Sequence, residues 1–236
     1  MPVAVITGAS QGLGLALARA LASAGWSVVA DARDAVRLDA AVAALPGGPH
    51  LGVPGDVTDS WHRGALAVSA ADLGGADLLV NNASTLGLDH QGGGRLPRLA
   101  DLEPEAYLRT MDVNVVAPMA LTSLVLPQLR ARHGRILNIT SDASVEPYET
   151  WGGYGSSKAA LDHATRVLAE EEPEVRVYAV DPGDLRTAMH QAAFPGEDIS
   201  DRPEPESVVP HLMTLVVGDV PSGRHRVADL EPVVRA

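Results

Sequence analysis

The chain of 236 residues contains no cysteine. It therefore forms no disulfide and no thiolate metal site, and cysteine usage says nothing about its compartment. The eight histidines lack the spacing that is typical of metal ligands. We therefore expect His190 and the other histidines to be solvated or structural, and we expect no bound metal.

Long hydrophobic runs are also absent. The most apolar long segment, Met111 to Pro127, is interrupted by Asp112, Asn114 and Pro118, which argues against a membrane-spanning helix. The start of the chain, MPVAVITGAS, has no basic region and no cleavage-like site, so we expect no signal peptide. The prediction is a soluble, cytoplasmic protein.

Positive charge is scarce. The chain has 18 lysine and arginine residues against 30 aspartate and glutamate residues, a formal net charge of −12. Its isoelectric point is about 5.0. This balance argues against nucleic acid or an anionic membrane as a partner. The length fits one large domain better than two, and we see no internal repeats.

Short apolar segments alternate with helical patterns along the chain. We expect strands near residues 3–6, 26–31, 50–53, 77–80, 136–139, 175–180 and 224–228. We expect helices near residues 15–25, 34–45, 59–73, 104–132, 153–171 and 205–217, the fourth of them kinked near residues 114–118. Such alternation predicts an α/β fold, a doubly wound parallel sheet of the Rossmann type. We expect one domain over residues 1–236, with a cofactor half at about 1–140 and a catalytic and substrate-binding half at about 141–236.

A glycine-rich turn follows the first strand. The sequence TGASQGLG, Thr7 to Gly14, separates the strand from an Ala/Leu-rich helix that ends at Gly25. Glycines allow close backbone approach, and a helix N-terminus offers free N–H groups, so this arrangement favours phosphate binding over an ordinary strand-to-helix turn. Loops at the strand ends converge on one sheet edge, so Gly8, Asp56 and Asn82 are expected to face one crevice.

The stretch from Ser141 to Lys158 carries the candidate chemistry. Tyr154 and Lys158 are four residues apart and share a helix face, where an ammonium is expected to lower the pKa of the phenol. Ser141 ends a strand and is placed to donate a hydrogen bond to a substrate oxygen. This set suits proton transfer at a carbonyl or hydroxyl oxygen. By itself, Tyr-x-x-x-Lys also fits a plain surface pair.

Taken together, these motifs resemble the single-domain branch of the short-chain dehydrogenase/reductase family over roughly residues 3–190. The matching segments are TGASQGLG, Asp56, Asn81-Asn82-Ala83, Asn114 within DVNVVAP, the Ser141, Tyr154 and Lys158 set, and Asp181-Pro182-Gly183 with Thr187. The order and spacing of all six make the resemblance specific.

The resemblance implies roles for individual residues. Tyr154 is the implied proton donor or acceptor, and Lys158 tunes it and binds the nicotinamide ribose. Ser141 holds the substrate oxygen, and Asn114, at a helix irregularity, helps to hold a water linked to Lys158. The implied nucleotide contacts are Thr7, Gly8, Ser10, Gln11, Gly12, Leu13, Gly14, Asp31, Arg33, Asp56, Val57, Asn82, Ala83, Tyr154, Lys158, Pro182, Gly183, Leu185 and Thr187.

The chain departs from the family pattern in three places. Ser84 stands where the family's Asn-Asn-Ala-Gly motif ends in glycine, which affects local turn geometry. Asp184 and Arg186 follow Pro-Gly where many members have apolar residues, so a more polar pocket is expected. The C-terminal end lacks the family's Asp-Gly-Gly, which affects the last strand and any tetramer contact formed there.

The end of the second strand, VVADARD, bears on the choice of nucleotide. An Asp there accepts hydrogen bonds from a ribose 2′-hydroxyl and selects NAD, whereas an Arg pairs with the 2′-phosphate of NADP. Counting from Gly25 in the manner of the family places Arg33 at the NADP position and Asp31 one residue short of the NAD position. We favour NADP(H) over NAD(H). A one-residue slip of the strand would restore Asp31 as an NAD selector.

The predicted function is NAD(P)(H)-dependent interconversion of a carbonyl and a secondary alcohol on a small organic substrate, as in a ketoreductase. The alternatives are an epimerase or dehydratase on the same scaffold and a non-catalytic nicotinamide sensor. The substrate loops are expected at residues 85–100, 142–152 and 184–206. Tyr148 or Trp151 is expected to line the pocket and to favour a ring-bearing substrate, unless both rings pack on a neighbouring subunit. Excess apolar surface on the long helices predicts a homodimer or a homotetramer.

Overall fold

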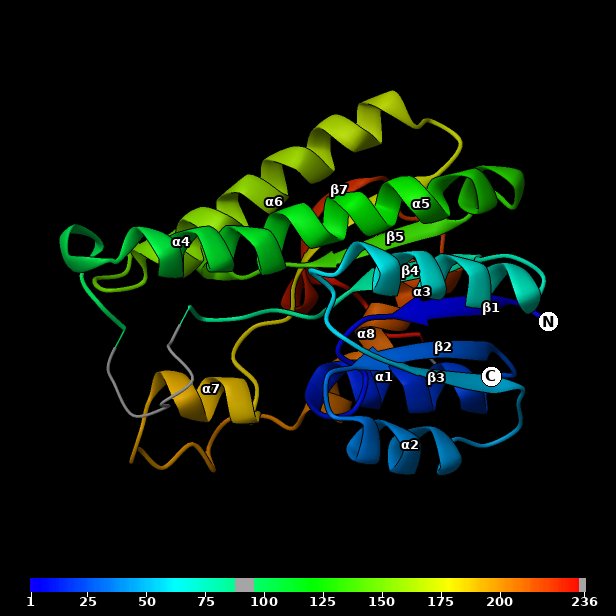
Figure 1. The fold of residues 1–236 in the computed structure, drawn as a ribbon, viewed down its shortest axis with the longest axis horizontal. Coiled ribbons are helices and arrows are strands. Elements are labelled where there is room, and N and C mark those ends of the chain that lie inside the picture. Colours follow the sequence, from blue (N-terminus) through cyan, green and yellow to red (C-terminus); the bar gives the residue numbers. More distant parts are fainter. Residues whose placement is uncertain (88–95, 234–236) are drawn as a thin grey trace.

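A seven-stranded parallel sheet forms the centre of the protein. The computed structural model describes residues 1–87 and 96–233. The strands lie in the order β3-β2-β1-β4-β5-β6-β7, and every neighbouring pair is parallel (Figure 1). They are β1 (Val3–Ile6), β2 (Ser27–Ala32), β3 (His50–Pro54), β4 (Leu78–Asn81), β5 (Arg135–Ile139), β6 (Arg176–Asp181) and β7 (Gly223–Arg226). The doubly wound sheet expected from the sequence is confirmed.

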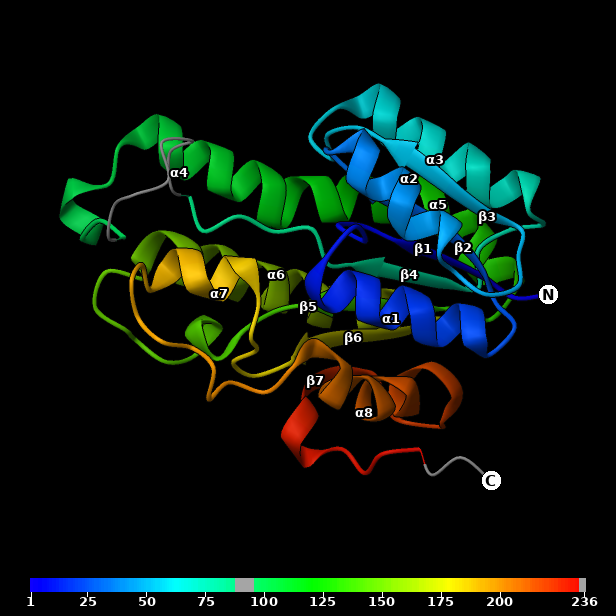
Figure 2. The same cartoon turned by 90° about the horizontal axis from the view of Figure 1, so that it is seen from below.

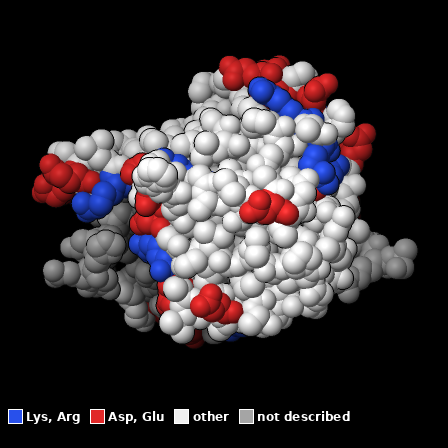
Figure 3. All heavy atoms as spheres, turned by 45° about the vertical axis from the view of Figure 1, so that its right-hand side comes forward, with Lys and Arg blue, Asp and Glu red and all other residues white. Residues whose placement is uncertain are grey.

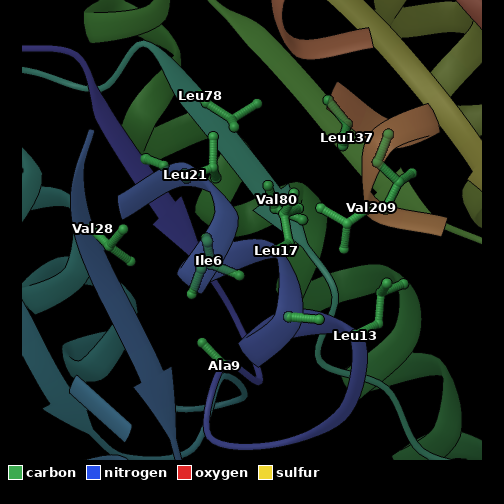
Figure 4. Packing of buried hydrophobic residues seen from close by; sticks show 14 of the residues in the cluster. Ile6, Ala9, Leu13, Leu17, Leu21, Val28, Leu78, Val80, Leu137 and Val209 are labelled. Atoms are coloured by element: carbon green, nitrogen blue, oxygen red, sulfur yellow. The ribbon is translucent and has the colours of Figure 1, made fainter. Parts of the chain in front are cut away.

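Helices cover both faces of this sheet (Figures 1 and 2). They are α1 (Gly12–Ser23), α2 (Ala35–Ala43), α3 (Ser60–Asp72), α4 (Pro104–Met111), α5 (Ala117–Ala131), α6 (Gly152–Glu171), α7 (Ala188–Ala193) and α8 (Pro205–Val217). On one face, α1 and α8 pack on alternate strand residues, and Figure 4 shows Leu17 of α1 and Val209 of α8 in this core. On the other face, α3 and α5 enclose a second core that includes Leu66 and Val125. Burial of both faces explains why the strands read as unbroken apolar runs.

The long helical region expected over residues 104–132 is interrupted as predicted. Asp112–Val116 forms a π-helix between α4 and α5. Pro118, the second residue of α5, has no N–H to donate to the carbonyl of Asn114, so a regular α-helical turn cannot close there. Irregular turns of this kind often lie at functional sites, and this one contains Asn114.

The same region is the one helical stretch of the described residues that is long and apolar enough to cross a membrane, by length and composition alone. Its α5 part packs on the sheet through Leu121, Val125 and Leu129, each at most 1% exposed. The second core therefore accounts for much of the apolar character of this stretch.

Charged side chains on the surface drawn in Figure 3 lie in small groups, with wide uncharged areas between them. Acidic and basic side chains adjoin one another in several of these groups. Among the described residues, this face therefore offers no broad basic area of the kind that binds nucleic-acid phosphates.

Candidate active site

A cavity of about 960 Å³ lies at the carboxyl ends of the strands. This is the edge at which ligands bind in open parallel sheets. The residues expected from the sequence that line it are Gly8, Ser10, Gln11, Gly12, Leu13, Asp31, Arg33, Asp56, Val57, Asn82, Ala83, Ser141, Tyr154, Lys158, Pro182, Gly183, Leu185 and Thr187. Thr7, Gly14 and Asn114 are not in this lining and support it from behind.

The glycine-rich turn forms one wall of the cavity. Gly8 and Gly12 have φ angles of +66° and +55°, a region that side chains disfavour. A Cβ on Gly14 would lie 2.4 Å from the carbonyl oxygen of Gly8, so only glycine fits there. The side chain of Gln11 does not cap α1, which leaves the first N–H groups of this helix free. This wall fits a phosphate group.

The loop after β4 holds that turn in place. Thr7 Oγ1 accepts hydrogen bonds from the backbone N–H groups of Asn82 and Ala83, both at 3.0 Å. Asn82 Nδ2 donates to the carbonyl oxygen of Thr7 at 2.9 Å. The Asn-Asn-Ala segment thus stabilises the backbone conformation of the glycine-rich turn through hydrogen bonds to Thr7.

Asp31 braces the glycine-rich turn from the side of β2. Its side chain is 2% exposed, and Oδ1 accepts from the backbone N–H of Gly8 at 2.7 Å. Oδ2 lies 2.8 Å from Nε2 of His62 on α3. A Cβ on Gly55 would overlap the ring of His62, so glycine at this position makes room for the pair. His62 could not be found from the sequence, because nothing in its spacing relates it to Asp31.

Two arginines stand at the same end of the cavity. Arg33 follows β2 and Arg37 lies in the first turn of α2, and both line the cavity. Arg37 Nη1 donates to Oε1 of Gln11 at 2.6 Å. Arg37 was missed by the sequence reading, although its position four residues after Arg33 was the signal available.

Tyr154 and Lys158 lie on α6 and face the cavity, as their spacing predicted. Both are largely enclosed, with exposed fractions of 8% and 3%. Lys158 Nζ donates to the carbonyl oxygen of Ile139 at 2.8 Å and lies 5.5 Å from the centroid of the Tyr154 ring. Ser141, after β5, lines the same part of the cavity.

Asn114 is fixed by a compact hydrogen-bond network behind these residues. Its Nδ2 donates to the carbonyl oxygen of Thr85 at 2.8 Å and to Ser157 Oγ at 2.9 Å. Its Oδ1 accepts from the backbone N–H of Thr85 at 2.8 Å and from Ser84 Oγ at 3.1 Å. Ser157, one residue before Lys158, in turn donates to the carbonyl oxygen of Tyr154 at 2.6 Å. The π-helix is thereby tied to the start of α6.

The protonation of the Tyr154 and Lys158 pair differs from expectation. Burial is the main cause that raises the pKa of Tyr154 above its usual value. The negative charges of Asp142 and Asp181 raise this pKa further, whereas hydrogen bonds with the hydroxyls of Ser141 and Ser84 lower it. Burial also lowers the pKa of Lys158 to about 8, against which Asp162 acts. The expected lowering of the phenol pKa is therefore wrong for this structure, because burial of the phenol is the largest influence on its pKa.

Ser84 and Asp142 are the polar neighbours of this site that the sequence reading undervalued. The hydroxyl of Ser84, where the family pattern has glycine, acts on both Asn114 and Tyr154. Ser141 Oγ donates to Asp142 Oδ1 at 2.9 Å, and the phenol of Tyr148 donates to Oδ2 at 2.7 Å. In the sequence, Ser84 could have been noticed because it replaces the glycine of the family pattern. Asp142 could have been noticed only because it lies next to Ser141.

The wall beyond Tyr154 is aromatic. Trp151 lines the cavity, and its ring lies 5.7 Å from that of Tyr154 and 5.9 Å from that of Phe194. Tyr148 does not line the cavity and is 47% exposed. The expectation that Tyr148 or Trp151 lines the pocket is met by Trp151, and Tyr148 lies outside the cavity wall. Residues 88–95 of the first expected substrate loop lie outside the described residues.

No cluster of three or more histidine or acidic side chains that could hold a metal ion occurs within residues 1–87 and 96–233. His190 lines the cavity and has its closest acidic neighbour, Asp184, at 3.8 Å. The polar groups of the cavity wall are hydroxyl, amine, amide, guanidinium, carboxylate and imidazole groups.

Known proteins are similar to this chain in sequence and in fold. A model of the short chain dehydrogenase family matches residues 2–198. Dehydrogenase/reductase SDR family member 4 of Bos taurus is 36% identical over 199 residues, which cover 81% of this chain and 68% of that protein. L-xylulose reductase of Homo sapiens is 32% identical over 236 residues, covering 98% and 85%. The structure of an alcohol dehydrogenase from the archaeon Thermococcus sibiricus complexed with 5-hydroxy-NADP has a TM-score of 0.84 and 28% identity, covering 100% of this chain and 98% of that one.

Proposed function

The chain belongs to the short-chain dehydrogenase/reductase family, and from this premise we propose that it is an NADPH-dependent ketoreductase that reduces a small organic ketone to a secondary alcohol. Oxidoreduction of a carbonyl/alcohol pair with a nicotinamide nucleotide follows from membership of the family itself. One observation carries the proposal: Ser141, Tyr154 and Lys158 share one cavity wall, in which Tyr154 is a buried phenol whose pKa is raised by that burial.

In the proposed reaction the protein acts on the carbonyl oxygen of the substrate. Ser141 Oγ, now bonded to Asp142, turns its hydrogen to that oxygen, and Tyr154 transfers the phenolic proton as negative charge develops there. A high phenol pKa keeps this proton available at neutral pH. The nicotinamide, when bound, supplies the hydride.

The remaining residues hold the nucleotide and the catalytic helix. The glycine cradle before α1 fits its diphosphate, because no side chain intrudes there and N–H groups are free. We assign Lys158 to the nicotinamide ribose and Asn114 to the support of α6 through Ser157. The alcohol dehydrogenase with 5-hydroxy-NADP, which has the same fold, supports a nucleotide in this cavity.

The direct test is a set of small ketones with NADPH, followed by the loss of nicotinamide absorbance. Turnover of at least one ketone is expected, with the reverse reaction favoured at higher pH. Nucleotide binding without turnover of any ketone would reject the ketoreductase assignment and point to another reaction on this scaffold or to a sensor.

We also propose a homodimer formed by the surface of α4, the π-helix, α5 and α6. This surface exposes the apolar side chains of Leu108, Val116, Leu124 and Val167, between 42% and 67% of each. The helices that carry them lie side by side in Figures 1 and 2. Exposed apolar side chains that gather on one side of a folded chain mark an interaction surface, and a two-fold pairing is the commonest way to cover such a surface.

Light scattering at micromolar concentration is expected to give the mass of two or four chains. The Leu124→Glu variant should dissociate, because it places an uncompensated charge in the middle of that surface. The matched control is Val36→Glu, since Val36 is 81% exposed on α2, away from these helices. A monomeric wild type, or equal dissociation of both variants, would refute the proposal.

Trp151 is proposed to favour substrates that carry a ring. The Trp151→Ala variant should lose about 2- to 10-fold in kcat/KM for ring-bearing ketones, since an aromatic contact contributes roughly 0.5–1.5 kcal/mol. A small aliphatic ketone should be affected less. Trp61→Ala serves as control, because Trp61 is 87% exposed. An equal loss on both kinds of ketone would remove Trp151 from substrate selection.

A further inference from the structure

An arginine from the edge strand β7 joins three segments of the active site. The guanidinium of Arg224 places Nε 3.0 Å from Asp162 Oδ2 and Nη2 3.3 Å from Asp181 Oδ2. Nη2 also donates to the carbonyl oxygen of Ser141 at 3.1 Å. The two carboxylate side chains are 7% and 5% exposed, and the arginine side chain is 22% exposed. Arg224 does not line the cavity, so it acts from behind the reacting groups.

Each of these contacts ends next to a residue of the site. The Ser141 carbonyl belongs to the residue whose hydroxyl faces the cavity. Asp181 Oδ1 accepts from the backbone N–H of Gly183 at 3.0 Å, and Gly183 lines the cavity. Asp162 lies one helical turn after Lys158 on α6, and it also accepts from Ser144 Oγ at 2.6 Å.

The charges of this cluster act on the catalytic pair. Two buried carboxylates are costly without a cation, and of the described side chains only the Arg224 guanidinium lies within ion-pair distance of both. Asp181 raises the pKa of Tyr154, and Asp162 raises that of Lys158. Asp142 after β5 also acts on Tyr154, and the cavity wall carries further charged or titratable groups, among them Arg109, Asp112, Asp184 and His190.

We propose that Arg224 is a positioning residue of the active site, which fixes the main chain at Ser141 and neutralises Asp162 and Asp181 so that the field at Lys158 and Tyr154 stays balanced. The kinetic part of this inference rests on the proposed reductase function. The electrostatic part does not rest on that function, because it is tested by the titration of the Lys158 amine, which needs no substrate.

Lys158 is the only lysine in the chain, so ¹⁵N-lysine labelling gives a single side-chain signal for an NMR titration. The wild type should titrate near pH 8. Removal of the guanidinium leaves Asp162 unbalanced, so the midpoint in Arg224→Met should rise by on the order of one pH unit. Adding Asp162→Asn to Arg224→Met should bring the midpoint back toward the wild-type value.

The control is Arg226→Met, since Arg226 lies on the same strand, is exposed, and forms no ion pair with the described residues. Its Lys158 midpoint should match that of the wild type. Asp162→Asn alone, which keeps Arg224, should lower the midpoint and serves if Arg224→Met does not fold. Equal midpoints in the wild type and Arg224→Met, a rise shared by Arg226→Met, or no fall in Asp162→Asn would each overturn the electrostatic role.

Loss of the Ser141 anchor should also lower kcat by about 10- to 100-fold, the scale of a small misplacement of a reacting group. Arg224→Lys, which keeps the charge, should recover part of that loss. Unchanged kcat in Arg224→Met would overturn the positioning role. If the wild type turns over no ketone, the reductase proposal fails. The Lys158 titration still decides whether Arg224 balances the negative charges of Asp162 and Asp181 at the site.

Discussion

Replacing Tyr154 with phenylalanine should lower kcat for ketone reduction by at least about 100-fold, the usual scale of general acid catalysis. Phenylalanine keeps the ring and its contacts with Trp151 and removes only the hydroxyl. The Kd for the nucleotide, measured by the quenching of tryptophan fluorescence, should change little, because the glycine cradle is untouched. Steady-state kinetics and this binding measurement together separate chemistry from binding.

The pH dependence of the two directions gives a second signature of Tyr154. Because burial raises the pKa of Tyr154, the phenol is protonated across the neutral range and reduction has its acid in place. Alcohol oxidation needs the phenolate, so its rate should rise with pH toward that raised pKa. The Tyr154→Phe variant should lose this rise.

Tyr107→Phe is the matched control for this experiment. The phenol of Tyr107 on α4 lies 3.0 Å from Ser156 Oγ on α6, so its removal also takes away one hydroxyl contact with the same helix. Tyr107 does not line the cavity, and its variant should retain most of the wild-type turnover. Turnover of Tyr154→Phe comparable to that of Tyr107→Phe would remove Tyr154 from its proposed role.

The fold could be predicted because its determinants are local. Apolar strands alternate with helices, and glycines follow β1, where only glycine allows the turn. The pairing of Tyr154 with Lys158 on one helix face follows from spacing alone. These features need no knowledge of contacts between distant residues.

The protonation of the site could not be predicted, because burial and distant partners decide it. The sequence shows that Lys158 can lie near Tyr154, but not that both are enclosed enough for desolvation to control their pKa values. Arg224 reaches Ser141 across 83 positions of the chain and is invisible to any local pattern. Ser84 was visible as a departure, but its bond to Asn114 was not.

The direction of the Asp31 side chain also could not be predicted from the sequence, because a distant contact decides it. Asp31 and Arg33 both stand near the end of β2, so both are candidates for selecting the nucleotide on sequence alone. The structure separates them, since Arg33 follows the end of β2 and is exposed while Asp31 is enclosed against His62. His62 lies 31 positions away in the sequence, and only the packing of α3 brings it there.

That difference leads to a prediction for nucleotide choice. An Asp selects NAD only when its carboxylate is free to accept from the ribose hydroxyl. Both oxygens of Asp31 are already occupied, by the Gly8 N–H and by His62. Arg33, with Arg37 beside Gln11, stands at the cavity wall with guanidinium groups that suit a 2′-phosphate. We therefore expect kcat/KM to be higher with NADPH than with NADH.

The Arg33→Ala variant should lose about 10- to 100-fold in kcat/KM with NADPH, because a hydrogen bond to a charged group contributes about 1.5–3 kcal/mol. Activity with NADH should change little, since NADH has no 2′-phosphate. Arg37→Ala should give a smaller loss of the same kind. Arg19→Ala is the control, because Arg19 is exposed on α1 and does not line the cavity.

Three measurements decide whether the arginines or Asp31 select the nucleotide. A wild type that prefers NADH, or an Arg33→Ala/Arg37→Ala variant that keeps its NADPH preference, would show that the arginines do not select the nucleotide. The His62→Phe variant adds an independent arm, because it removes the partner that holds one oxygen of Asp31. If Asp31 is held back only by that contact, His62→Phe should raise kcat/KM with NADH. If the contact with the Gly8 N–H alone holds it, the nucleotide preference should stay as in the wild type, and NADPH selection then depends on the arginines.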